Sequence, residues 1–321
     1  MTAVDTGYII LKSYEGHKLN NSVYEHIGSI VPKERILFQE PMSRYTTFRV
    51  GGEAECMVLV ESKEELSQLV FFLAQSGQNY FILGNGSNLL VGDKGYRGII
   101  LKLGKRMAGI HVEGTHLVAG AGALLSQVAA AARDAGLSGF EFAAGIPGSI
   151  GGAIVMNAGA YDGEMKQIVK LVRVMDQRGE ILTLDNDTME FGYRTSIIKD
   201  RPFVVMAAVF ALTQKDRETV SARMDELMKL RKSKQPLEYP SAGSTFKRPE
   251  GYYAGKLIMD AGLRGYRIGG ARVSEKHCGF VVNDGGATAA DIREVIEEVQ
   301  ERVRDKFHVR LEPEVIYLGD F

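Results

Sequence analysis

Residues 145–153 read Gly-Ile-Pro-Gly-Ser-Ile-Gly-Gly-Ala, the densest glycine cluster in a chain of 321 residues. Because glycine has no Cβ, such a run allows sharp turns and lets another group approach the backbone closely. A second cluster, Gly84-Asn-Gly-Ser-Asn88, lies nearer the N-terminus. Successive amide N–H groups in turns of this kind form sites for anions. From the two loops alone, a diphosphate-bearing cofactor and ordinary tight turns are equally good explanations.

Three common motifs are absent from the sequence. No Gly-x-Gly-x-x-Gly follows a predicted strand, so a Rossmann dinucleotide-binding fold is not supported. Between Gly251 and Gly255 stand three residues rather than the four of a P-loop, and Leu257 replaces its Ser or Thr. The segment 147–151 lacks the first glycine of a nucleophile elbow. The two glycine loops are therefore the remaining candidates for a cofactor site.

The composition excludes several classes of function. Lys and Arg number 39 against 40 Asp and Glu, so a general attraction to nucleic acid or to an acidic membrane is not expected. Two cysteines are too few for a disulfide framework, and the scattered histidines form no His-Glu-x-x-His motif, so we expect no metal site. The first residues do not resemble a signal peptide, and the longest apolar run, Phe203 to Leu212, is too short to span a bilayer. We therefore expect a cytoplasmic protein.

Apolar periodicity predicts alternating strands and helices after a helical or irregular lead-in of residues 1–40, to which no chemistry is assigned. Ser62 with Glu65, and Thr288 with Asp291, predict capping boxes at the start of two helices. The predicted helices span residues 62–77, 124–135, 215–232, 254–261 and 288–307. The predicted strands span residues 56–60, 79–83, 89–91, 99–103, 168–175, 181–184, 203–212, 279–282 and 309–318.

Three polar residues are candidates for chemistry, and each has a simpler explanation. Arg194, after Tyr193, carries a planar cation that suits a carboxylate, but a surface arginine is the more common case. Ser244 could donate a proton, but serines more often serve turns or helix caps. Glu314 could be an acid, or a solvated carboxylate at the edge of a strand. None of the three would indicate a function by itself.

Taken together, the motifs resemble those of UDP-N-acetylenolpyruvoylglucosamine reductases, the MurB family. The resemblance runs over roughly residues 44–318 in the family's order. Beside the two glycine loops it rests on Thr46-Thr-Phe-Arg-Val-Gly-Gly52, Met156-Asn-Ala-Gly-Ala160, Tyr193-Arg194, Ala242-Gly-Ser-Thr-Phe-Lys247 and Leu311-Glu-Pro-Glu-Val315. The glycine loops alone indicate the wider family of vanillyl-alcohol-oxidase-type flavoproteins, and the last three motifs narrow the choice to this reductase.

The resemblance implies an α+β fold: a two-lobed FAD-binding domain of the vanillyl-alcohol-oxidase/PCMH type, followed by a C-terminal α/β substrate-binding lobe. The implied boundaries are 1–40 for the lead-in, 41–108 with the strand 309–321 for the first lobe, 109–213 for the second and 214–308 for the third. Some members carry a long insertion with a tyrosine that closes over the UDP group. Here Thr213 runs directly into the helix near Asp216, so the shorter type is expected.

The resemblance also implies the reaction. NADPH reduces bound FAD, and a hydride then passes from flavin N5 to C3 of the enolpyruvyl group of UDP-N-acetylglucosamine enolpyruvate. Protonation of the resulting enolate at C2 gives UDP-N-acetylmuramate for peptidoglycan synthesis. By family match, Arg194 and Glu314 stabilise the enolate and Ser244 is the general acid. Glu314 must then be protonated, which predicts a raised pKa.

The remaining implied site residues bind cofactor or substrate. Tyr193 and Lys234 match contacts to the UDP-sugar. The expected FAD contacts are Thr47, Arg49, Gly51, Gly84, Asn85, Gly86, Ser87, Asn88, Gly145, Pro147, Gly148, Ser149, Gly151, Gly152, Ala153, Asn157 and Gly159. Two alternatives stay open: another FAD-dependent oxidoreductase of the same fold, and a nucleotide-binding module without catalysis. The oligomeric state is not determined by the sequence, and a monomer is the default expectation.

Overall fold

The computed structural model describes residues 21–321, and the described chain divides into two compact units. The first unit comprises residues 21–37, 56–84 and 98–228, and the second comprises 38–55, 85–97 and 229–321. Each unit is therefore assembled from three separate stretches of sequence. Much of the predicted lead-in, residues 1–20, lies outside the described residues.

Strands and helices alternate along the first unit, as the periodicity predicts. Its helices are α1 (Asn21–Ile30), α2 (Lys63–Gln75), α3 (Leu125–Asp134), α4 (Ile150–Val155), α5 (Met165–Ile168) and the start of α6 (Arg217–Lys234). Its strands are β3 (Tyr80–Leu83), β6 (Ile110–Glu113), β7 (His116–Gly120), β8 (Leu137–Ser138), β9 (Gly159–Ala160), β10 (Gly163–Glu164), β11 (Val169–Met175), β12 (Ile181–Asp185), β13 (Val204–Ala211) and β14 (Thr213–Gln214). Three strands pass from one unit into the other: β1 (Ile36–Pro41), β2 (Glu53–Val60) and β5 (Tyr96–Leu103).

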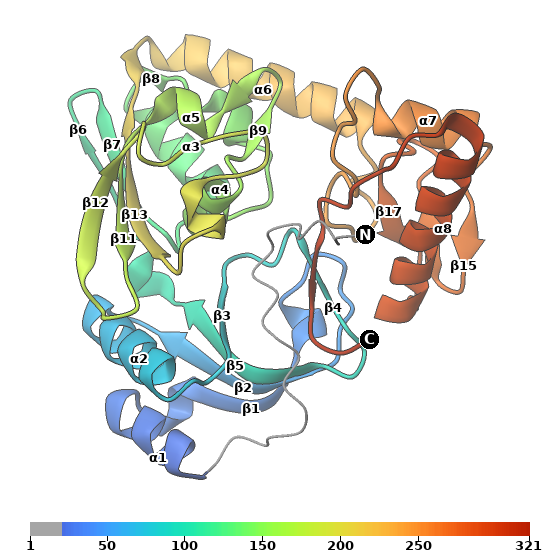
Figure 1. Cartoon of the computed structure of the whole chain (residues 1–321). Helices are drawn as coiled ribbons and strands as arrows, with labels where there is room; N and C mark the ends of the chain where they lie inside the picture. Colours follow the sequence, from blue (N-terminus) through green and yellow to red (C-terminus); the bar gives the residue numbers. More distant parts are fainter. Residues whose placement is uncertain (1–20) are drawn as a thin grey trace. The chain divides into compact units, whose positions relative to one another are not determined.

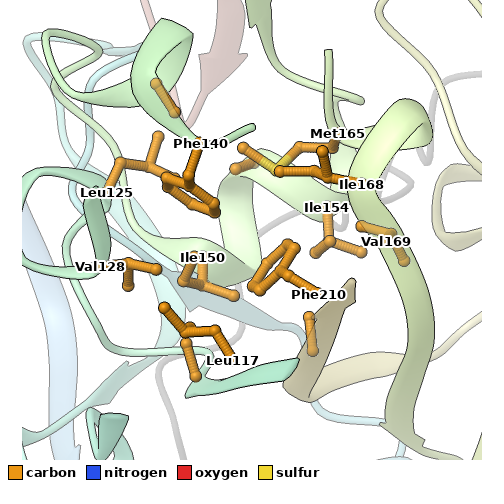
Figure 2. Close-up of a cluster of buried hydrophobic side chains, with 14 of the residues drawn as sticks. Leu117, Leu125, Val128, Phe140, Ile150, Ile154, Met165, Ile168, Val169 and Phe210 are labelled. Carbon is orange, nitrogen blue, oxygen red and sulfur yellow. The ribbon is translucent and has the colours of Figure 1, made fainter. Parts of the chain in front are cut away.

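An antiparallel sheet with strand order β12-β11-β13-β7-β6 forms much of the first unit. Helices α3 and α4 lie against one face of it (Figure 1). Between sheet and helices lies a buried apolar cluster in which the Phe140 ring meets the Phe210 ring edge-on, 5.1 Å between centroids (Figure 2). Ile150 and Ile154 of α4 are fully buried in the same cluster. This burial explains why a glycine-rich stretch that reads as a loop forms a short helix.

A second buried cluster of the first unit lies between α1, α2 and strands β2 and β5. Leu66, Leu69, Val70 and Leu73 form the buried face of α2, as their helical spacing predicts. Ser62 caps this helix by accepting a hydrogen bond from the Glu65 N–H at 3.1 Å. The predicted box is only half formed, however, because the Glu65 carboxylate accepts from the Glu61 N–H at 2.9 Å and pairs with Arg35. The ion pair with Arg35 orients that carboxylate away from the cap.

The second unit contains β4 (Leu89–Val91), α7 (Ala254–Asp260), β15 (Arg267–Ile268), β16 (Ala271–Val273), β17 (Val281–Asn283), α8 (Ala289–Phe307) and β18 (Ile316–Leu318). Five single-turn 3-10 helices complete the described chain, at Lys33–Arg35, Met42–Arg44, Lys105–Met107, Glu141–Ala143 and Ile197–Lys199. Helix α8 packs its apolar stripe on the sheet β15-β16-β17. Its predicted capping box is confirmed, since Thr288 and Asp291 exchange both hydrogen bonds.

The predicted strand 309–318 is wrong over most of its length. Only Ile316–Leu318 form a strand, which pairs in parallel with Leu89–Val91. Pro313 has no N–H to donate to a ladder. Residues 312–314 instead make isolated contacts with the segment 245–247, including a bridge between Phe246 and Pro313. The chain bends there, and that bend carries one of the predicted catalytic residues.

Candidate active site

The two glycine loops meet in the first unit through Gly84 and Ser149. A Cβ on Gly84 would lie 2.5 Å from the Ser149 Oγ, so a side chain at position 84 would collide with the hydroxyl. Ser149 precedes α4 and is 4% exposed. Its hydroxyl is buried and finds no hydrogen-bond partner among residues 21–321. A buried polar atom without a partner is costly, which indicates a group that a ligand would satisfy.

The backbone around Ser149 is fixed by the neighbouring segment 121–125. The Leu125 N–H donates to the Gly148 carbonyl at 2.9 Å, and the Gly151 N–H donates to the Ala121 carbonyl at 2.9 Å. A Cβ on Gly151 would lie 3.2 Å from the Ala121 Cβ, so this glycine allows the two segments to pack closely. The loop therefore has a defined shape. The other predicted FAD contacts in this loop are Gly145, Pro147, Gly148, Gly152 and Ala153.

Lys102 supplies a cation next to the first loop, and the sequence analysis missed it. Its Nζ donates to the Gly84 carbonyl at 3.1 Å from the neighbouring strand β5. Burial lowers the pKa of Lys102 below its usual value, because the charged form loses solvation. A lysine that follows an apolar run of a predicted strand was the available signal.

Arg194 is displayed by a tight turn of the first unit. Gly192 and Thr195 exchange backbone hydrogen bonds of 3.1 and 3.3 Å, and Arg194 between them has a φ of +56°. Its guanidinium donates through Nη2 to the Gly159 carbonyl at 3.1 Å. The guanidinium carbon also lies 5.2 Å from the centroid of the Tyr193 ring, which is exposed. The predicted arginine, the predicted substrate tyrosine and Gly159 are thus brought together.

Asn157, a predicted flavin contact, forms three side-chain hydrogen bonds within the first unit. It is fully buried, and its Nδ2 donates to the Gly192 carbonyl at 2.9 Å and to Glu164 Oε2 at 3.1 Å. Its Oδ1 accepts from the Lys166 N–H at 2.9 Å. The amide group thus ties the segment after α4 to the arginine turn. A direct contact of this side chain with FAD stays a prediction.

In the second unit, the segment 45–52 packs against the first glycine loop. A Cβ on Gly86 would lie 1.8 Å from the Tyr45 carbonyl oxygen, and Gly86 has a φ of +61°, so glycine is required on both grounds. The Thr47 N–H donates to the Gly86 carbonyl at 3.2 Å. The Thr47 hydroxyl is buried without a hydrogen-bond partner in the described chain. This unit therefore holds a second orphaned hydroxyl beside a predicted cofactor loop.

Two further predicted FAD contacts shape the same turn. Arg49 is exposed and has a φ of +58°. Gly51 has a φ of +120°, and a Cβ there would lie 2.8 Å from the Val91 Cβ. Asn283, which the sequence analysis missed, donates through Nδ2 to the Phe48 carbonyl at 3.0 Å and closes the turn from the other side. Asn85, Ser87 and Asn88 complete the predicted contacts of this unit.

Ser244 and Glu314 are brought together in the second unit. The Glu314 N–H donates to the carbonyl of Thr245, the residue after Ser244, at 2.8 Å. Ser244 is exposed and Glu314 is half-buried. The Asn88 side chain donates to the Glu314 carbonyl at 2.9 Å, which joins the first glycine loop to this pair. Two of the three predicted catalytic residues and one predicted cofactor loop therefore share one hydrogen-bonded framework, while Arg194 belongs to the first unit.

Thr245 is the missed residue that fixes this framework. It is fully buried, its N–H donates to the Gly279 carbonyl at 2.8 Å, and its Oγ1 accepts from the Val281 N–H at 2.9 Å. Gly243, with a φ of +78°, turns the chain just before Ser244. The position of Thr245 inside the quoted motif 242–247 was the only signal in the sequence. Lys234 ends α6, far along the chain from both loops, and its side chain is exposed.

Residues 21–321 contain no group of three or more His, Cys, Asp or Glu side chains that could hold a metal ion. No helix in that range has the length and apolar character needed to cross a membrane. The residues at the loops do fit FAD. In each unit a buried hydroxyl beside a predicted loop, Ser149 in the first and Thr47 in the second, offers unused hydrogen-bonding capacity.

Comparison with known families assigns both parts of the chain. A model described as an FAD binding domain matches residues 54–185. A model described as the C-terminal domain of UDP-N-acetylenolpyruvoylglucosamine reductase matches residues 235–318. The two matches cover both glycine loops and the segment that contains Ser244 and Glu314.

Similar proteins are matched over nearly their whole length. The UDP-N-acetylenolpyruvoylglucosamine reductase of Lachnoclostridium phytofermentans is 49% identical over 306 residues, which cover 94% of this chain and 99% of that protein. The reductase of Caldanaerobacter subterraneus subsp. tengcongensis is 50% identical over 296 residues, with coverages of 92% and 98%. The crystal structure of the Thermus caldophilus reductase, MurB, superposes with a TM-score of 0.76 at 36% identity, over 88% of this chain and 98% of that one.

Proposed function

The chain belongs to the UDP-N-acetylenolpyruvoylglucosamine reductase family, and we propose that Arg194, Ser244 and Glu314 carry out its chemistry on the substrate. The protein is an FAD-dependent oxidoreductase of peptidoglycan precursor synthesis, and NADPH is the reductant. The α+β fold with an FAD-binding domain, expected from the sequence, is confirmed. Strand β14 ends at Gln214 and α6 begins at Arg217, which fits the shorter type without the tyrosine insertion.

The reaction adds a hydride to C3 of an enol ether and a proton to C2. When bound, FAD supplies the hydride that it has taken from NADPH. The protein must therefore bind the carboxylate of the enolpyruvyl group, stabilise the negative charge that develops on it, and donate one proton at C2. A fixed cation, an acid that hydrogen-bonds the carboxylate and a proton donor are the three groups that this requires.

Arg194 supplies the cation. An arginine remains charged throughout the physiological pH range, and its planar guanidinium suits a carboxylate. Its contact with the Gly159 carbonyl and the turn 192–195 limit where the guanidinium can lie before substrate binds. A cation held in place in this way stabilises developing charge without reorganising during the reaction.

Ser244 supplies the proton and Glu314 hydrogen-bonds the substrate carboxylate. Both are mounted on one framework by the hydrogen bond from the Glu314 N–H to the Thr245 carbonyl, and this single observation supports the pairing most directly. Exposure of the Ser244 side chain fits direct contact with substrate. We propose that Glu314 is protonated in the reactive complex, because only the acid form can donate to a carboxylate oxygen.

The assignment is tested by following flavin absorbance in single-turnover experiments. In Ser244→Ala, reduction by NADPH should keep its rate, while reoxidation by the enolpyruvyl sugar nucleotide should slow by about 100-fold or more, the usual contribution of a general acid. Ser241→Ala, in the same segment, serves as the matched control and should reoxidise at the wild-type rate. Reoxidation of Ser244→Ala at the full rate would show that another group donates the proton.

The same experiment separates the reductase from another FAD-dependent oxidoreductase of this fold. Reduced wild-type flavin should be reoxidised rapidly by the enolpyruvyl sugar nucleotide, and only slowly by unrelated oxidised substrates under anaerobic conditions.

We also propose a cytoplasmic location and a monomeric state. Cys56 and Cys278 are both buried, which fits a reducing compartment. Fractionation of cells and sedimentation of the purified protein test these two points.

The predicted contacts form a coherent proposal for the cofactor. Ser149 of the first unit and Thr47 of the second each offer a buried hydroxyl that could donate to or accept from a ligand. Removal of FAD should therefore leave both hydroxyls unsatisfied and lower the midpoint of thermal unfolding. Restoring FAD should raise it in a concentration-dependent way, because a ligand that binds only the folded state stabilises it. Tyr193 and Lys234 remain the proposed contacts of the UDP-sugar.

A further inference from the structure

We propose that Lys199 is a positioning residue for Arg194 and that Asn157 is its counterpart on the other side of the same turn. Neither role follows from the family comparison. The inference rests on the proposed function only in that Arg194 acts on the substrate carboxylate. All contacts involved lie within the first unit.

The turn 192–195 holds Arg194 in a conformation that an arginine rarely adopts. The backbone of Arg194 has a φ of +56°, in the left-handed region that non-glycine residues seldom occupy. Such a conformation persists where the surroundings determine it, and it is concentrated at functional sites. If the φ of Arg194 became negative, its side chain would leave the turn in another direction and the guanidinium would move away from the Gly159 carbonyl. Some contact must therefore hold the backbone of this residue.

Lys199 provides that contact. Its Nζ donates to the Arg194 carbonyl at 2.7 Å, a short charge-assisted hydrogen bond. Lys199 ends the 3-10 helix Ile197–Lys199, in which Ile198 is buried at 5% exposure. Ser196, directly before this helix, donates from Oγ to the Val155 carbonyl at 2.9 Å. The backbone of Lys199 is therefore held in place, so its ammonium can donate to the Arg194 carbonyl from a defined position.

Asn157 holds the opposite end of the turn. Its Nδ2 donates to the Gly192 carbonyl, and the same short segment supplies the Gly159 carbonyl that accepts from the Arg194 guanidinium. The turn is thus tied at Gly192 by an amide, at the Arg194 carbonyl by an ammonium, and at the guanidinium by a carbonyl. These three contacts fix both the backbone and the side chain of one residue.

The expected consequence concerns only one half of the catalytic cycle. If Lys199 acts through Arg194, its loss should slow the step that needs the guanidinium, which is reoxidation by the enolpyruvyl substrate. Reduction by NADPH does not involve an enolate and should be unaffected. A general weakening of the fold would slow both steps, or lower cofactor content, so the two half-reactions distinguish positioning from support of the fold.

The decisive experiment is a double-mutant cycle between Lys199→Met and Arg194→Lys, measured as the single-turnover rate of flavin reoxidation. In the wild-type background, Lys199→Met should lower this rate 10- to 100-fold, with NADPH reduction changed less than twofold. In the Arg194→Lys background, the same substitution should change reoxidation less than twofold, because the group that it positions is already lost. Lys199→Arg keeps a cationic donor and should recover most of the rate. Lys170→Met, an exposed lysine of the same unit, is the matched control.

Several outcomes would overturn the proposal. Equal fold-losses from Lys199→Met in both backgrounds, equal slowing of both half-reactions, or an unchanged reoxidation rate would each exclude positioning through Arg194. If Lys199→Met does not fold, Lys199→Gln replaces it, because glutamine keeps a neutral donor at similar reach. The wild-type enzyme and Ser244→Ala are measured alongside. Failure of the wild type to react with the enolpyruvyl substrate would refute the proposed function, whereas an active wild type with an unaffected lysine variant would refute only the positioning role.

Discussion

The turn that carries Arg194 and the framework that carries Ser244 and Glu314 are built in different ways. The arginine turn is held by side chains, the amide of Asn157 and the ammonium of Lys199, which contact backbone carbonyls. The framework is held mainly by the main chain, through the hydrogen bond between Glu314 and Thr245. A region held by side chains fails when one residue changes. A region held by backbone pairing tolerates most side chains, but it is vulnerable where the backbone itself is constrained.

The largest effect is expected from Gly86→Ala, in the backbone-held region. The new Cβ would meet the Tyr45 carbonyl oxygen and would also force a left-handed conformation on alanine. We expect a loss of about 4 kcal/mol in the free energy of unfolding, the sum of a steric and a conformational penalty. Denaturant unfolding measures it. Gly114 also has a positive φ, but a Cβ there would meet no atom within 4 Å. Gly114→Ala should therefore lower the free energy of unfolding by only about 1 kcal/mol. Equal costs would show that close packing at Gly86 is unimportant.

Asn157→Ala tests the region held by side chains. It removes three hydrogen bonds from a fully buried site, takes the partner of the Lys166 N–H away, and leaves the Gly192 carbonyl with the longer bond from the Thr195 N–H. We expect a loss of about 2–3 kcal/mol in stability, together with slower flavin reoxidation by substrate. Denaturation curves and single-turnover absorbance provide the two measurements. A variant that loses stability while reoxidising at the wild-type rate would mean that the arginine turn does not depend on this amide.

Thr245→Val is the corresponding change in the backbone-held framework. It removes only the bond from the Val281 N–H, while the two backbone hydrogen bonds of Thr245 remain. Stability should fall by about 1–2 kcal/mol, and reoxidation should change less than threefold. Thr245→Ser keeps the hydroxyl and is the control. If Thr245→Val slowed reoxidation as much as Ser244→Ala does, the framework would depend on side chains as well. The two regions would then not differ in how they are held.

The smallest expected effect is a pH dependence at His277, which borders the same framework. Its Nδ1 accepts from the Gly279 N–H at 3.1 Å, and burial lowers the pKa of His277 below 6.5. The neutral ring is therefore favoured in the folded state, while the unfolded chain takes up a proton near pH 6.5. Stability should fall as the pH drops below 6.5, and His277→Asn should flatten part of that decline. Unfolding curves between pH 5 and 8 measure it. Parallel curves for the two proteins would exclude a contribution from this ring.

The sequence predicts most elements because their signals are local. Thr288 and Asp291 lie within one turn of each other, and the apolar stripe of α8 repeats at helical spacing, so the helix begins at the predicted residue. Helix α4 of the first unit shows where such reasoning stops. Residues 150–155 contain two glycines that disfavour a helix, yet burial of Ile150 and Ile154 against the sheet outweighs that preference. The strand predicted over 309–318 fails because Pro313 interrupts it.

The candidate site shows the same division between local and distant information. The motifs around Ser244 and Glu314 suggest that both residues are important. Nothing in the sequence indicates that these two distant segments meet, as they do through the hydrogen bond from the Glu314 N–H to the Thr245 carbonyl. Asn157 matches a motif of the family, but no local pattern indicates the three hydrogen bonds that its side chain forms within the protein. Lys199 and Lys102 act on carbonyls, and the only signal for either in the sequence is the apolar run that precedes Lys102.

The short parallel pairing between β4 and β18 has a consequence for how the molecule is made. Leu89–Val91 are synthesised long before their partners Ile316–Leu318. The segments 38–55 and 85–97 can pack on each other, but they gain the rest of the second unit only when residues 229–321 have been made. Contacts between positions so distant along a chain form late and slowly. We therefore expect the second unit to complete its fold later than the first during translation.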